Sequence, residues 1–246
     1  MASMQLRLSL LASLVLPATL CYAQQPHIEQ VGAAAQANLQ ALVNGSPTVV
    51  PNGSRNEILG SPYADDRWLP AKLIMSNKVP LAPVPLKYDV LNKRLLMRLV
   101  DRPKDSLQLD DRLLERFILQ EPATGLTPAR ERVFRRFTEA PVPSQRTQFV
   151  EVLQEGKYTL LKQYIKVVHK APTGAYTTGN RLDEVEDKPT YYVRRPDATA
   201  VPVKLNLKQM QSSVPELAAA LKDAPGAKNA KTEAEWTAVF QSLNAR

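Results

Sequence analysis

The stretch that decides the fold is QFVEVLQEGKYTLLKQYIKVVH, residues 148–169. Two runs rich in Val, Leu, Ile, Tyr and Phe lie on either side of Glu155-Gly156-Lys157. An acidic residue followed by Gly between two apolar runs is typical of a tight antiparallel β-hairpin. We therefore expect this hairpin to form the centre of an antiparallel sheet.

The N-terminus has the pattern of a secretory signal peptide. Arg7 precedes an apolar core at 8–20, and small residues follow as far as Ala23. The apolar core is too short to span a bilayer, so we predict a signal peptide at 1–23 that is cleaved after Ala23. The mature chain would then be exported, either to the periplasm or out of the cell.

The single cysteine, Cys21, lies inside this predicted leader. It could be acylated as in a lipoprotein, but Leu20 stands where lipoprotein processing needs a small residue, so we expect ordinary cleavage. A cysteine-free mature chain excludes disulfides, thiolate catalysis and Cys-ligated zinc. The full chain has a formal net charge of +8, which attracts anionic surfaces but says nothing about the fold.

The rest of the chain divides into three parts. Residues 24–57 have few large apolar side chains, which predicts a flexible tether. Residues 58–206 contain short β-rich runs separated by turn signals, which predicts an antiparallel β domain. In 207–246 the apolar spacing changes to three and four residues, which predicts two or three helices packed on the same domain, the last of them capped by Thr232. Strands first and helices last indicate an α+β fold that is mainly antiparallel β.

Two segments are harder to assign. Residues 126–138 include Thr127-Pro128, a good helix start, but they lie between predicted strands, and we predict a strand. Residues 170–188 are polar and include an acidic patch, which predicts a long loop.

Five short motifs occur between Gly60 and Leu243: GSPY, WLP, LKYD, FVEVLQEGKYTLLK and TYYV. With the two helices that follow them, they make the chain resemble a group of uncharacterised exported proteins of Gram-negative bacteria. The resemblance implies one domain in which 130–137 is a strand. It implies no activity, cofactor or catalytic residue.

Few side chains in the sequence could support covalent or metal chemistry. The chain has two imidazoles, His27 and His169, and lacks both the G-x-S-x-G elbow and the Gly-rich loops that hold phosphates. Zinc sites need several His or Cys ligands, which this chain cannot supply. The acidic run at 183–187 lacks the order of an EF-hand loop and is typical of a solvated turn. We therefore expect no catalytic residue, no cofactor and no metal site.

Glycoside hydrolysis remains open, because it needs only two carboxyl groups a few ångströms apart. Asp65-Asp66 and Asp110-Asp111 are candidates by residue type. Adjacent residues on an extended chain point to opposite faces, so neither doublet is itself a catalytic pair. A hydrolase would need two acids from distant strands to converge.

Aromatic and basic side chains on the predicted hairpins offer a candidate ligand surface. Its members are Tyr158, Tyr164, Tyr191, Tyr192, Arg194 and Arg195. Tyrosine rings can stack on a sugar and arginines can attract an anionic glycan or lipid headgroup, although the tyrosines could equally be cross-strand pairs with one wet face. Phe134 and Phe137 are interleaved with the arginines at 130, 132, 135 and 136, and this segment could form a nucleic-acid strip. Export disfavours that partner, and we expect no nucleic acid.

The sequence therefore indicates a non-enzymatic exported protein of the cell envelope, with a binding or structural role. Its expected partner is another envelope protein, an anionic glycan or a lipid headgroup. One alternative is a carboxylate-dependent hydrolase that acts on polysaccharide. Another is an adhesion or assembly protein that uses an exposed sheet edge.

Overall fold

The computed structural model describes residues 49–50, 58–77, 81, 83–98, 106–125, 127–171 and 182–245. The predicted signal peptide, Cys21 and His27 lie outside these residues, as does most of the predicted tether. Within the tether, Val49–Val50 forms strand β1, which pairs with Ser106 and Leu107.

Eleven antiparallel strands form the main sheet, in the order β1-β6-β5-β4-β3-β7-β8-β9-β10-β13-β14. After β1 they are β3 Leu69–Met75, β4 Val84–Asp89, β5 Arg94–Arg98, β6 Ser106–Gln108, β7 Leu114–Glu121, β8 Arg130–Arg136, β9 Phe149–Gln154, β10 Thr159–Gln163, β13 Thr190–Arg194 and β14 Ala200–Val203. On one side of β3, the strands β4, β5 and β6 follow in order towards the edge of the sheet. On its other side, β3 pairs with β7. The strand expected at 130–137 is confirmed as β8.

The hairpin of the deciding stretch is confirmed, but its expected place at the centre of the sheet is wrong. β9 and β10 pair antiparallel, yet they lie between β8 and β13, towards the β14 edge, while β7 is the middle strand. The glycine of this turn is required by a close approach from another element. A Cβ at Gly156 would lie 2.2 Å from Asn244, whose side chain bonds the backbone N–H and C=O of Tyr158.

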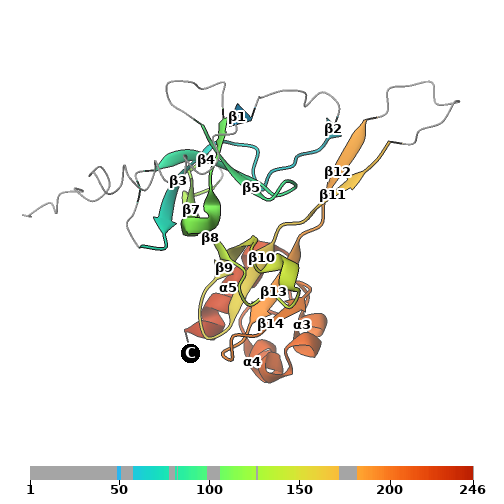
Figure 1. Cartoon of the computed structure of the whole chain (residues 1–246). Helices are drawn as coiled ribbons and strands as arrows, with labels where there is room; N and C mark the ends of the chain where they lie inside the picture. The colour runs from blue at the N-terminus through green and yellow to red at the C-terminus, as the bar shows by residue number, and fades with distance from the viewer. Residues whose placement is uncertain are drawn as a thin grey trace, which may run out of the picture.

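A second, three-stranded sheet consists of β11 Lys166–His169, β12 Asp183–Asp187 and β2 Ile58–Leu59. The β11–β12 hairpin extends away from the helices (Figure 1). The loop predicted at 170–188 is therefore wrong for its second half, because β12 pairs antiparallel with β11 and parallel with β2. Ion pairs such as Lys166 to Asp187, with Nζ and Oδ1 2.6 Å apart, explain how so charged a segment can form a strand.

Helices occupy the C-terminal end, as predicted. They are α3 Leu207–Ser213, α4 Ala218–Asp223 and α5 Glu233–Asn244, with short 3₁₀ turns at Asp111–Leu113, Pro143–Gln145 and Pro215–Leu217. The turn that begins at Pro215 separates α3 from α4. Thr232 and Glu235 form the expected capping box at the start of α5. The fold is α+β and mainly antiparallel β.

Two apolar cores lie along one face of the main sheet. The N-terminal core packs β3, β4, β7, β8 and β9 around the stacked rings of Phe117 and Phe134, whose centroids are 4.7 Å apart. The C-terminal core packs the three helices on β10, β13 and β14, with Trp236 of α5 fully buried beside Leu160 and Val193. Within the part of the chain that the structure describes, no helix is long and apolar enough to cross a membrane.

Candidate functional site

A buried polar cluster lies on the face that carries both cores. Arg132 of β8 and Glu151 of β9 form a two-pronged ion pair, with Nε to Oε1 at 2.9 Å and Nη2 to Oε2 at 3.2 Å. Arg132 Nη2 also donates to the Tyr164 hydroxyl at 2.6 Å, and that hydroxyl donates to Glu151 at 2.5 Å. Arg132 is 5 % exposed and Glu151 2 % exposed, so each charge depends on its partner.

Burial and the neighbouring charges shift the ionisation of this cluster. Burial raises the pKa of the Tyr164 hydroxyl, and the charge of Glu151 raises it further. Burial alone would lower the pKa of Arg132, but its bonds to Glu151 raise it above the ordinary value. The cluster is therefore a neutral phenol between a fixed cation and its carboxylate partner.

Asp65 connects the buried cluster to the surface. Its Oδ2 lies 3.1 Å from Arg132 Nη1 and 2.9 Å from Arg67 Nη2, while Arg67 also bonds Glu121. Burial tends to raise the pKa of Asp65, but hydrogen bonds from Arg67 outweigh it and hold that pKa below the ordinary 3.8. Asp65 and Glu151 thus come from distant parts of the chain and converge on one guanidinium. Because its pKa is lowered, Asp65 is a poor general acid.

The free energy of unfolding should fall in acid because of these carboxylates. The pKa values of Asp65 and Glu121 are depressed in the folded state, so the unfolded chain binds more protons as the pH falls from about 4.5 through those folded values. Their contribution to the free energy of unfolding is fully present above the unfolded pKa values and is lost as the pH falls through the lower, folded values. We expect Arg67→Gln to flatten this acid limb in urea unfolding measured from pH 7 to pH 3, mainly through Asp65, because Arg130 still bonds Glu121. An unchanged acid limb in Arg67→Gln would contradict the assignment.

The first turn of α5 continues the polar contacts towards the C-terminal core. Lys162 Nζ lies 2.7 Å from Glu233 Oε2 and 4.7 Å from the centre of the Tyr164 ring. The Tyr191 hydroxyl donates to the same Glu233 oxygen at 3.0 Å. Burial, followed by the charge of Glu233, raises the pKa of Tyr191, so its hydroxyl stays a neutral donor. The bond to Glu233 thereby fixes the ring of Tyr191, the second residue of β13.

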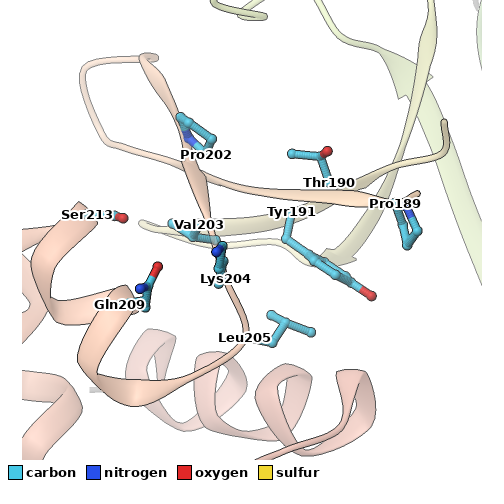
Figure 2. A pocket seen from close by; sticks show the side chains of 9 residues that line it. All are labelled: Pro189, Thr190, Tyr191, Pro202, Val203, Lys204, Leu205, Gln209 and Ser213. Atoms are coloured by element: carbon cyan, nitrogen blue, oxygen red, sulfur yellow. The ribbon is translucent and has the colours of Figure 1, made fainter.

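A hollow of about 430 Å³ lies where β13 and β14 meet α3, and we name it the Tyr191 hollow. Its lining residues are Pro189, Thr190, Tyr191, Pro202, Val203, Lys204, Leu205, Gln209 and Ser213 (Figure 2). Gln209 and Ser213 come from α3, and Lys204 lies between them and Tyr191 in this view. The wall combines a tyrosine ring, proline and aliphatic surface with an amide, two hydroxyl groups and an ammonium group. Such a mixture of apolar surface and a few polar groups is typical of a small-ligand site.

The six predicted ligand residues are distributed over several surroundings. Tyr191 lines the hollow and bonds Glu233. Glu233 also pairs with Lys162, whose ammonium group lies over the Tyr164 ring. Tyr192 points to the opposite face of β13, where it is 5 % exposed and contacts Phe137 edge to face at 4.8 Å. Tyr158 packs on the C-terminal core beside Asn244.

The two predicted arginines are ion-paired and do not line the hollow, although Arg195 bonds the backbone of its lining residue Ser213. Arg194 Nε lies 3.6 Å from Glu139 Oε1. Arg195 Nε lies 2.6 Å from Glu216 Oε1, and its Nη2 donates to the carbonyl of Ser213. The structure therefore connects Tyr164 to Tyr191 through Lys162 and Glu233 but does not gather the six residues in one site, and their role in binding stays a prediction.

The other candidates for chemistry are occupied by structural contacts. His169 Nε2 lies 2.6 Å from Glu186 on the β11–β12 hairpin. Asp110 bonds Arg112, and Asp111 lies beside Arg136. Phe134 and Phe137 from the possible nucleic-acid strip are fully buried. Among the residues the structure describes, no group of three or more His, Cys, Asp and Glu side chains could hold a metal ion.

Sequence reasoning missed the helical half of the hollow. Lys204, Gln209 and Ser213 are ordinary surface residue types, and nothing in their spacing indicates that α3 folds back on β14. The buried cluster left a clearer signal, since Glu151 interrupts the apolar run FVEVL directly after the buried Phe149 and Val150. No family model, curated protein or solved structure matches this chain.

Proposed function

We propose that this protein is a non-enzymatic exported module of the cell envelope that binds a glycan in the Tyr191 hollow. The observation that carries the proposal is the hollow itself, whose wall contains both the Tyr191 ring, held by its bond to Glu233, and the polar side chains of α3. A fixed aromatic ring can stack on the apolar face of a sugar, and the amide and hydroxyl groups can bond its hydroxyls. Lys204 would favour a glycan with an acidic substituent.

The hydrolase alternative has less support. The acids that converge from distant segments, Asp65 and Glu151, share Arg132 between them, and the pKa of Asp65 is lowered. Glycoside hydrolysis instead needs one carboxyl group with a raised pKa. The assembly alternative is weaker at the β14 edge, because Pro202 lacks the N–H group that an added strand would need.

Changing the ring of Tyr191 should separate stacking from hydrogen bonding. We expect Tyr191→Phe to keep glycan binding and Tyr191→Leu to weaken it at least tenfold, about 1.4 kcal/mol, when measured by calorimetric titration against neutral and acidic oligosaccharides. Because Tyr191→Leu also changes the C-terminal core, Gln209→Ala provides a second test on an exposed position. The matched control is Lys208→Ala, its exposed neighbour on α3 outside the hollow. Equal affinities for all these variants would contradict the site.

A further inference from the structure

A second hollow, of about 410 Å³, lies where the ends of β4, β8 and β9 meet the turn at Asp111–Leu113. We name it the Lys93 hollow. Four cationic side chains line it, those of Lys93, Arg112, Arg136 and Arg146, against the carboxylate of Asp111, and Arg112 is also paired with Asp110 next to the hollow. It shares no lining residue with the Tyr191 hollow. An excess of positive charge in a concave site concentrates anions there.

Arg136 is the fixed cation of this hollow. Its guanidinium donates to the backbone carbonyls of Thr147 and Asp111, and Nη2 lies 3.3 Å from Asp111 Oδ1. The same group lies over the Phe149 ring, 4.1 Å from its centre. These contacts hold the planar group in one orientation, which favours recognition of a planar or tetrahedral oxyanion.

Tyr88 supplies a neutral donor in the same wall. The residue is 4 % exposed, and the backbone N–H of Phe149 bonds its phenolic oxygen. Burial raises the pKa of Tyr88 to about 12, so the hydroxyl keeps its proton at neutral pH. A buried, neutral phenol beside fixed cations can donate a hydrogen bond to an anion, and it carries no negative charge that would repel the anion.

Lys93 has no ion-pair partner for its ammonium group among the described residues. Its backbone is left-handed, with φ at 54°, a conformation that favours glycine and is strained for lysine. The turn is otherwise well determined, since Asn92 and Arg94 both bond Asp89. The fold alone would therefore be better served by glycine at position 93, and the lysine adds a free ammonium group to the hollow.

We propose that the Lys93 hollow binds a small oxyanion, a phosphate or carboxylate group carried by a sugar-sized ligand. Arg136 and Tyr88 would hold the anion on the fixed wall, and Lys93 and Arg146 would close on it from the exposed rim, where Nε of Arg146 bonds the Ala140 carbonyl. The volume is within the usual range of small-ligand sites. This site is independent of glycan binding at Tyr191 and goes beyond it.

The test is a calorimetric titration of the full chain at low ionic strength with inorganic phosphate and with glucose 6-phosphate, alongside sedimentation with phosphatidylglycerol vesicles. We expect Lys93→Gly to weaken the binding of both soluble anions about tenfold without lowering the thermal unfolding midpoint. The control Lys157→Ala removes the same charge from an exposed lysine outside the hollow and should leave the affinity unchanged.

The outcomes separate the possible sources of the anion. Binding of soluble anions that Lys93→Gly and Arg146→Ala both weaken supports the site. Vesicle binding that depends on Lys93, with stronger retention than the soluble anions, supports it with a lipid headgroup as the source. Failure to bind any probe, or equal weakening by Lys157→Ala, overturns it. Either result leaves the Tyr191 proposal standing, because the two hollows have no residue in common.

Discussion

Replacing Arg132 with methionine is expected to lower the free energy of unfolding by about 3–5 kcal/mol. The substitution keeps most of the side-chain volume but leaves the 2 % exposed Glu151 without its cation. Tyr164 would remain as a donor to Glu151, and Asp65 would keep Arg67. Urea unfolding followed by circular dichroism at pH 7 measures the loss.

The double variant Arg132→Met/Glu151→Leu provides the control for this prediction. Replacing a buried ion pair by apolar groups of similar volume is often nearly neutral, so the double variant should recover most of the stability lost in the single one. A single variant that loses less than about 1 kcal/mol would contradict a buried, mutually dependent pair. A double variant that is less stable than Arg132→Met would do the same.

Trp236→Ala is expected to cost about 3–5 kcal/mol, because it leaves a large cavity beneath α5. Trp236 is fully buried between the helix and the strands of the C-terminal core. Gln241→Ala, an exposed position on the same helix, is the control and should change stability by less than about 0.5 kcal/mol.

The same variant tests whether the two cores belong to one cooperative unit. The chain has two tryptophans, and in Trp236→Ala the remaining Trp68 reports on the region beside β3. The contacts from Arg132 through Tyr164 and Lys162 to Glu233 connect the cores, so the unfolding midpoint seen by Trp68 should fall as far as that seen by circular dichroism. A Trp68 transition that stays at the wild-type urea concentration would show that the cores unfold separately.

Local patterns predicted the elements whose stabilising contacts are local. The apolar runs around Glu155-Gly156-Lys157 predicted β9 and β10, and Thr232 with Glu235 predicted the start of α5. The contacts in these elements join residues only a few positions apart, so the sequence pattern indicates them. The α+β class followed from the change of spacing at 207.

The features that sequence analysis missed depend on contacts between distant segments. The strand β12 is held by ion pairs and by its neighbours β11 and β2, which its own polar composition cannot indicate. Likewise Gly156 is explained by Asn244, 88 residues further along the chain by its numbering. Both hollows arise where separate elements meet, so the grouping of Gln209 with Tyr191, or of Lys93 with Arg136, could not be read from spacing.

The most direct test of the proposed function is to incubate the purified chain with acidic and neutral envelope oligosaccharides and to record both binding and cleavage products. The proposal predicts saturable binding that Gln209→Ala and Tyr191→Leu weaken and Lys208→Ala does not, with every oligosaccharide recovered intact. Release of shorter sugars that disappears when Asp65 or Glu151 is replaced would contradict it and identify a hydrolase instead.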